Sequence, residues 1–319
     1  MITLESAELA ITLDPRVGGT ITSIMHRKTG LSILGTVPWD TQEGPFPGTG
    51  AQDENAWLPY YTGGWPLLFP NGGDACNFGG VFHGFHGEAS ITPWRAELRE
   101  GRVTLTRRFF TVPVTMSRTM SLSGAELVIE EEVEMTGGTP VDVMWGHHAT
   151  FGSDLLSGPF EITSGAGRVM VDGVYDPAAN MLLPGACGEL SAMPGKRGAV
   201  DISRPKAPLS ALLYLDRFDV AWAAIRRLDD AIAVKLEWDS KLFPCAWLWC
   251  ELQGLVDPPW HGRAMLIGIE PNTTRPAFGL AQATARGGRL LQLEPGSCHR
   301  TRLSLFVFRP SGPIGSSPP

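Results

Sequence analysis

The 319-residue sequence has few cysteines, no long apolar run and no cluster of basic residues, and each shortage argues against a class of protein. Its five cysteines are odd in number and form no CxxC pair, which argues against a disulfide scaffold and favours a reduced, cytoplasmic protein. No apolar run approaches the ~20 residues of a membrane span. With 26 Lys and Arg against 33 Asp and Glu, the chain lacks the basic surface that binds nucleic acid. A neutral small molecule suits this composition.

Amphipathic helical patterns are scarce, whereas short segments that alternate apolar and polar residues are frequent. Glycine (38 residues) and proline (26 residues) separate these segments. Ten of them predict strands: 7–14, 19–26, 103–110, 114–123, 126–135, 160–165, 168–175, 232–239, 264–270 and 300–308. In segment 126–135, glutamates alternate with apolar residues, except that Glu131 falls on the apolar face. Segment 209–231 is ambiguous and allows a helical turn.

Many strands and few helices predict an all-β fold, a large antiparallel β-sandwich. No repeat or linker interrupts residues 1–309, which we expect to form a single domain. Residues 310–319 are rich in Pro, Gly and Ser and are predicted to be a flexible tail. Exposed sheet edges allow a monomer or a homodimer. The irregular stretch 41–80 is long for a loop, and its aromatic residues favour an ordered, functional one.

Strand periodicity limits which histidines can share one site. His147 and His148 are adjacent in an extended segment, so they point to opposite faces and only one can reach a given pocket. His83 and His86 are three residues apart, and the same parity separates them less firmly. Each pair therefore offers one imidazole to a shared site, and its partner is expected to be structural or exposed.

Glu270 is a candidate general base at the end of a predicted strand. It shares a strand face with Gly268, and a glycine there leaves open space on the sheet that a bound ring could occupy. Pro271 follows Glu270 and ends the strand. A solvated glutamate with no catalytic role is the alternative for such a position.

Four motifs, in this order, resemble the galactose mutarotase (aldose 1-epimerase) superfamily, specifically its divergent bacterial branch. They are GGWPLLFPN (63–71), HGFHGEASITPW (83–94), GHHATF (146–151) and IGIEP (267–271), and the opening segment 14–34 is similar to the family's first hairpin. Order and spacing agree from about residue 5 to residue 308. The resemblance implies a galactose mutarotase-like supersandwich, a carbohydrate-active domain, and an isomerase that needs no cofactor.

The resemblance also implies the catalytic residues. His83 matches the family's first catalytic histidine, His148 the second, and Glu270 the catalytic glutamate. Exchange of sugar anomers requires that a proton leave the O1 hydroxyl and that another reach the ring oxygen. Glu270 is then the base and His148 the acid, with His83 near O1 or the ring. Such acid–base pairs typically contribute ~10²–10⁴ in rate.

Aromatic residues in and near the motifs suit the apolar face of a pyranose. The predicted sugar contacts are Trp65, Phe69, Trp145 and Trp249, with Asn71 fixing orientation and Asp239 standing in for the family's sugar-binding aspartate. Core packing is the alternative for the aromatic residues. Classical members carry an arginine just after the Phe-Pro element, whereas this chain has Asn71 and Asp74 there.

Three other interpretations remain. A cupin-like metal site could use His83, His86, His148 and Glu88, but HGFH is not the H-x-H pattern of cupins, so no metal is predicted. The fold could also serve a non-catalytic carbohydrate-binding or regulatory protein. Alternatively, the chain could be an epimerase or isomerase of an unusual sugar. The sequence leaves the identity of the sugar open.

Overall fold

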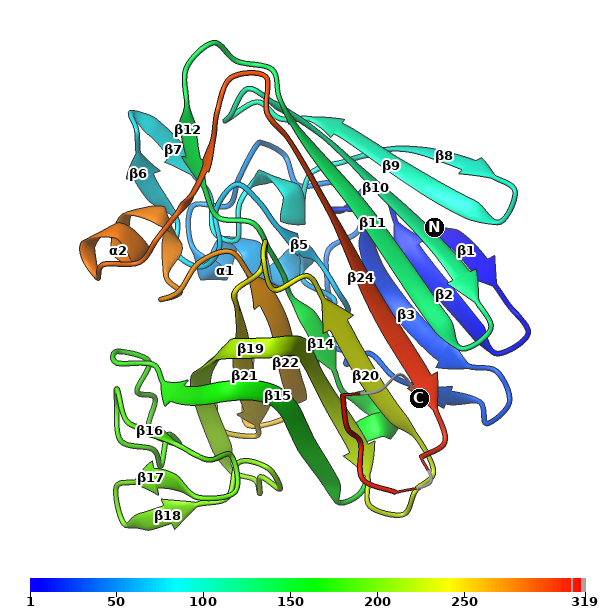
Figure 1. Cartoon of the computed structure of the whole chain (residues 1–319), viewed down its shortest axis with the longest axis vertical. Helices are drawn as coiled ribbons and strands as arrows, with labels where there is room; N and C mark the ends of the chain where they lie inside the picture. The colour runs from blue at the N-terminus through cyan, green and yellow to red at the C-terminus, as the bar shows by residue number, and fades with distance from the viewer. Residues whose placement is uncertain (311, 317–319) are drawn as a thin grey trace.

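The computed structural model describes residues 1–310 and 312–316, and antiparallel pairing joins all its named strands (Figure 1). The largest sheet has the order β5 (Leu67–Leu68), β13 (Gly146–His147), β22 (Met265–Asn272), β21 (Cys245–Leu252), β19 (Leu209–Arg227), β20 (Ala233–Trp238), β24 (Cys298–Phe308), β11 (Glu126–Met135), β10 (Val114–Ser123), β9 (Arg102–Arg108) and β8 (Arg95–Arg99). In addition, β14 (Ala149–Phe151) pairs with β22, β15 (Phe160–Val171) with β19, and β16 (Cys187–Gly188) with β15.

A second sheet consists of β1 (Ile2–Glu5), β2 (Leu9–Asp14), β3 (Thr20–His26) and β4 (Leu31–Ser32). Two-stranded pairs are β6 (Cys76–Phe78) with β7 (Val81–His83), β12 (Val141–Val143) with β23 (Leu291–Leu293), and β17 (Met193–Gly195) with β18 (Gly198–Val200). The helical segments are α1 (Glu54–Trp57), α2 (Gly279–Ala285), η1 (Leu58–Tyr60), η2 (Glu88–Ser90) and η3 (Ser153–Leu156). No helix in the described ranges is long and apolar enough to cross a bilayer.

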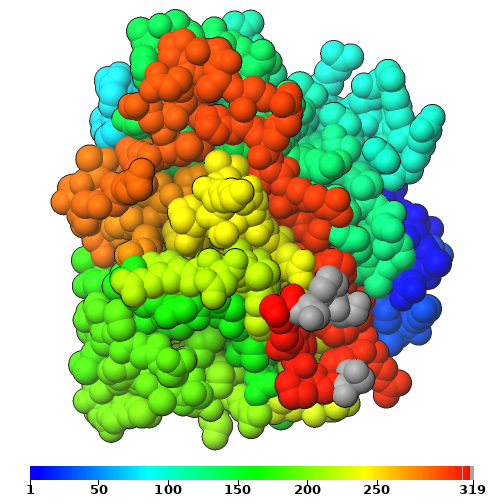
Figure 2. All heavy atoms as spheres, in the orientation of Figure 1, coloured from blue at the N-terminus to red at the C-terminus, as the bar shows by residue number. Residues whose placement is uncertain are grey.

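Apolar side chains from the two sheets meet in one core, which explains why the alternating segments became strands. Ile11 and Ile21 from the small sheet, and Ile129 and Leu305 from the large one, are fully buried in it. All ten predicted segments overlap strands, so the all-β prediction is confirmed. Figure 2 shows orange atoms near the C-terminal end of the chain beside green atoms from its middle, so distant segments share one surface.

The ambiguous segment 209–231 is largely strand β19, with no helical turn within Leu209–Arg227. Its first eight residues are all buried, because the strand lies in the middle of the sheet with both faces covered. This is why the segment lacks the alternation that marks the other strands. In the predicted tail, residues 311 and 317–319 lie outside the described residues, while the Ser316 carbonyl accepts a hydrogen bond from Lys235 Nζ at 2.9 Å.

The polar exception in β11 is explained by a buried ion pair. Arg118 in β10 lies directly opposite Glu131, and Arg118 Nε donates to Glu131 Oε1 at 2.6 Å. Trp145 Nε1 donates to the other carboxylate oxygen at 3.0 Å, and His147 Nε2 lies 3.3 Å from it. Burial opposes ionisation of Glu131, but His147 and Arg118 outweigh burial and lower its pKa to about 2.

Removal of the Glu131 charge should destabilise the fold strongly, because it leaves the Arg118 guanidinium buried without a counter-ion. We expect Glu131→Gln to lower the free energy of unfolding by about 3–5 kcal/mol, measured by urea denaturation at neutral pH. Since the pKa of Glu131 is lowered, the pair's contribution is present above about pH 4.5 and is lost as the pH falls toward about 2. Glu134→Gln, at an exposed position of the same strand, is the control. Equal unfolding midpoints for the two variants would contradict this account.

Candidate functional site

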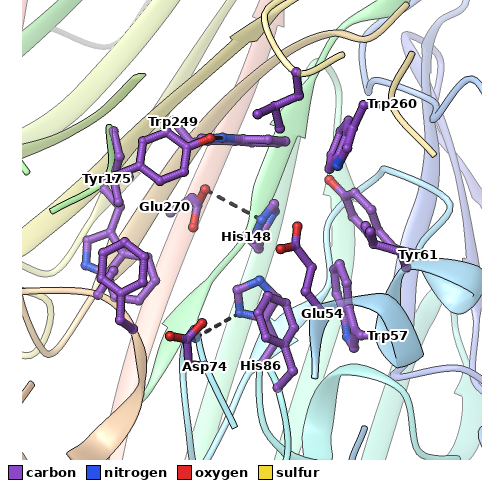
Figure 3. A pocket seen from close by; sticks show the side chains of 18 residues that line it. Glu54, Trp57, Tyr61, Asp74, His86, His148, Tyr175, Trp249, Trp260 and Glu270 are labelled. Carbon is purple, nitrogen blue, oxygen red and sulfur yellow. Dashed lines mark hydrogen bonds and ion pairs between the residues drawn. The ribbon is translucent and has the colours of Figure 1, made fainter. Parts of the chain in front are cut away.

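A pocket lies against one face of β21 and β22, and about 720 Å³ of space, its open mouth included, is free of protein atoms. Cross-strand pairing places Trp247 opposite Glu270 and Trp249 opposite Gly268, so these four residues share the face that forms the pocket wall. The size suits a small ligand such as a sugar ring. Figure 3 shows the carboxylate of Glu270 and the ring of His148 pointing toward each other across this space.

Gly268 makes room for the Glu270 carboxylate rather than for a ligand ring. A Cβ atom at position 268 would lie 2.4 Å from Glu270 Oε1. The expectation of open space on the sheet at Gly268 is therefore wrong, because the neighbouring carboxylate fills that space. Glu270 is 2% exposed, and no hydrogen bond holds its carboxylate among the described residues.

His148 is the nearest polar partner of Glu270. Its Nε2 lies 3.7 Å from Glu270 Oε1, which is too long for a hydrogen bond but short enough for a proton to pass through one bridging hydroxyl. Burial raises the pKa of Glu270 well above its ordinary value and lowers the pKa of His148 to about 4. In the empty pocket, burial therefore shifts both groups toward their neutral forms.

A hydrogen-bonded chain behind His148 fixes the orientation of its ring. Thr150 Oγ1 lies 2.8 Å from His148 Nδ1 and 2.7 Å from the Tyr61 hydroxyl oxygen. The sequence allows this because His148 sits between β13 and β14, where the side chains of residues 148 and 150 point to the same side. Burial raises the pKa of Tyr61, so its phenol stays protonated in this chain.

His86 is the second imidazole of the pocket, and Gly73 holds it at two points. The Gly73 backbone N–H donates to the ring atom His86 Nδ1 at 3.0 Å. The backbone N–H of His86 donates to the Gly73 carbonyl at 2.8 Å. These bonds retain His86 in a left-handed conformation (φ 55°) that is uncommon for a residue other than glycine. Because Nδ1 accepts, the ring proton sits on Nε2. Burial and the nearby His148 lower the pKa of His86 well below its ordinary value.

Aromatic side chains from the predicted long loop and from later segments close the pocket. Trp57 in α1 stacks on Tyr61 at a centroid distance of 4.5 Å and contacts His86 edge-on at 4.7 Å. Trp249 lies 5.8 Å from His148 and 5.7 Å from Trp260. Asp53 begins the short α1 helix, because its carboxylate accepts from the Ala56 N–H at 2.9 Å. The remaining aromatic lining residues are Phe85, Tyr175, Trp247 and Phe278.

Of the three predicted catalytic residues, Glu270 and His148 line the pocket and His83 does not. His83 is the last residue of β7, where it pairs with Cys76 and is buried. The chain leaves the strand after His83 and turns, which brings His86 to the pocket instead. Of this pair, His86 and not His83 therefore reaches the pocket, whereas the family resemblance had pointed to His83 and left His86 as the structural or exposed partner.

Most of the predicted sugar contacts also lie outside the pocket. Among them, Trp249 lines it. Trp65, Phe69 and Trp145 are fully buried in the main core, which agrees with the alternative prediction that these aromatic residues pack in the core. Asn71 is fully buried, and its amide binds the carbonyls of Asp74 and Gly84 and the Leu280 N–H, so no polar atom remains for a ligand. Asp239 accepts from the Lys241 N–H in the turn after β20.

Several lining residues escaped sequence reasoning. Trp57 and Tyr61 lie in the long aromatic stretch that the sequence marked as ordered, so composition gave a partial signal for them. Glu54 begins α1 within that stretch but is not aromatic, and Trp260 and Phe278 come from loops without a motif, so these three had no such signal. Within residues 1–310 and 312–316, no group of three or more His, Cys, Asp or Glu side chains could hold a metal ion.

Comparisons with known proteins agree with this architecture. No protein-family model matches the chain, and no curated protein matches it. A Synechocystis protein is 19% identical, with TM-score 0.66 over 97% of this chain and 96% of its own. A candidate aldose 1-epimerase from Escherichia coli K12 is 16% identical, with TM-score 0.67 over 96% of this chain and 98% of its own. A galactose mutarotase-like protein from Lactobacillus casei is also 16% identical, with TM-score 0.67 over 97% of this chain and 100% of its own. The chain therefore has the galactose mutarotase-like fold, and the predicted fold is confirmed.

The protonation of the two pocket histidines can be tested by NMR. We expect the His148 ring signals to stay unchanged from about pH 7 to about pH 5, because its pKa is about 4. The ¹⁵N spectrum of His86 should show the proton on Nε2 over the same range. His148→Gln and His86→Gln variants assign the signals. A His148 midpoint near the ordinary histidine value, or a proton on His86 Nδ1, would contradict the burial and the hydrogen bonding described above.

Proposed function

We propose that this protein interconverts the α and β anomers of a monosaccharide by acid–base catalysis, as an aldose 1-epimerase-like isomerase of the cytoplasm. The observation that carries the proposal is the buried Glu270–His148 pair, 3.7 Å apart, in the wall of an aromatic-lined pocket. The galactose mutarotase-like fold supports the same reaction. Burial shifts both groups toward their neutral forms, and a carboxyl–imidazole pair of this kind can both give and accept a proton.

The reaction uses one proton that Glu270 and His148 exchange between them. In the empty pocket, burial favours protonated Glu270 and neutral His148. Sugar hydroxyls that donate to the carboxylate would stabilise its charged form and so move the proton onto His148. Glu270 then accepts the O1 proton while His148 gives its proton to the ring oxygen, and the ring opens. After rotation about the C1–C2 bond, the ring closes by the reverse transfers, which restores both groups.

His86 acts here as a hydrogen-bond donor rather than as an acid. The Gly73 N–H occupies its Nδ1, so Nε2–H is the polar atom left to meet the sugar. A neutral donor of this kind stabilises negative charge that develops on O1 or on the ring oxygen without itself losing a proton. Trp57 and Trp249 offer flat faces to the C–H side of a pyranose.

Replacement of the proposed base should abolish turnover while the pocket stays intact. We expect Glu270→Gln to slow the catalysed mutarotation of α-D-glucose or α-D-galactose by about 10²–10⁴-fold, measured by polarimetry on freshly dissolved sugar. Glu134→Gln should retain full activity. If the wild-type protein binds these sugars but does not speed their equilibration, the protein is a carbohydrate-binding module and the proposal fails.

A matched pair of histidine variants tests which residue of the HGFH segment serves the reaction. We expect His86→Asn to lower kcat by about 10²-fold, because it removes a donor from the pocket, whereas His83→Asn should leave kcat near the wild-type value. Urea denaturation of both variants separates lost activity from lost folding. The opposite ranking, with His83 essential and His86 dispensable, would show that the arrangement of this segment in the working enzyme differs from the one described.

A further inference from the structure

The pocket is lined by acidic side chains and by no basic Lys or Arg side chain among the described residues. Glu54, Asp74 and Glu270 contribute carboxylates, and none of the described lining residues is Lys or Arg. A phosphate or carboxylate on a sugar is usually held by arginine or lysine, which offer charge-assisted hydrogen bonds. The pocket offers an anionic sugar no such partner and adds repulsion from the acidic groups.

Two of these carboxylates stand free at the pocket mouth. Glu54 is the first residue of α1, and Asp74 follows the Gly72–Gly73 turn that holds His86. Neither side-chain carboxylate makes a hydrogen bond or ion pair with another described residue, and Figure 3 shows both reaching toward the space around His86. Partial burial, followed by the negative charge of Asp74, raises the pKa of Glu54. Partial burial alone raises the pKa of Asp74.

Glu54 and Asp74 face the same space around His86, and the negative charge of Asp74 contributes to the raised pKa of Glu54. A positive group near Glu54 and Asp74, which are both exposed, would relieve the repulsion between their charges. The ring of Trp57 lines the same pocket, and aromatic faces attract ammonium groups as well as sugar C–H groups. The ring of Phe278 already meets the Arg286 guanidinium, which lies 5.7 Å from its centroid. Glu270 and His148 favour neutral forms, so the charge at the mouth belongs to the two free carboxylates.

We infer that the pocket takes a sugar that carries a protonated amine, such as a 2-amino-2-deoxyhexose, and rejects sugar phosphates and uronates. This inference rests on the proposed function in one respect only, namely that the pocket is the sugar site. The amine lies at the mouth between Glu54 and Asp74, and the anomeric carbon lies deeper, next to Glu270 and His148. Amine recognition and proton transfer therefore use different side chains.

Binding of sugars without an anomeric hydroxyl separates recognition from turnover. The probes are 1,5-anhydro-D-glucitol, its 2-amino-2-deoxy analogue and its 6-phosphate, and their affinities are measured by calorimetry at about neutral pH. We expect the amino probe to bind about tenfold more tightly than the neutral one, and the phosphate to show no binding. Added salt should narrow the gap between the amino and neutral probes, because the mouth is open to solvent.

The double variant Glu54→Gln/Asp74→Asn should bind the amino and neutral probes equally. Glu134→Gln, far along another strand, should keep the wild-type preference. The inference is overturned if the neutral probe binds as tightly as the amino probe, if the phosphate binds, if the preference survives in the double variant, or if no probe binds. Wild-type preference for the amino probe without mutarotase activity would instead refute the proposed reaction and leave this inference standing.

Discussion

The pocket depends on a charged pair that lies on the other side of the same strand segment. Glu131 and Arg118 are buried together in the sandwich core, where the Glu131 carboxylate faces the ring of His147. His147 takes part in that core network, and the next residue, His148, faces the pocket. Because adjacent residues of an extended chain point to opposite sides, whatever fixes His147 also fixes His148. The core and the site are thus coupled by one peptide unit rather than by a long path of contacts.

Loss of water is the second constraint that shapes the site. Glu270, His148 and His86 are all nearly removed from solvent, and burial shifts each toward its uncharged form. A charged pair at this position would be costly without a ligand, whereas a neutral pair is tolerated in the empty protein. In the proposed reaction, polar groups of a bound sugar reverse that balance. Under that proposal, the ligand brings the electrostatic conditions under which the pair becomes reactive.

The sequence predicted the structure well where the backbone is a regular strand and poorly where it turns. Alternation located the strands, and parity separated His147 from His148 correctly because that stretch is extended. Parity had no value for His83 and His86, since the chain leaves β7 after His83 and takes a left-handed turn at His86 that only tertiary contacts with Gly73 support. The aromatic motif residues Trp65 and Trp145 were read as sugar contacts although their indole N–H groups serve the core network, because a motif does not tell which face of a sheet a ring occupies.

Gly268 has a consequence for the entropy of the site. The Glu270 carboxylate occupies the volume that a side chain at position 268 would take, between its own strand and the neighbouring strand β21. A carboxylate confined in this way has lost much of its rotational freedom before any substrate arrives. That loss is incurred once, when the protein folds, and is not repeated at each binding event. The absence of a side chain at position 268 thus gives the Glu270 carboxylate one defined place before any ligand binds.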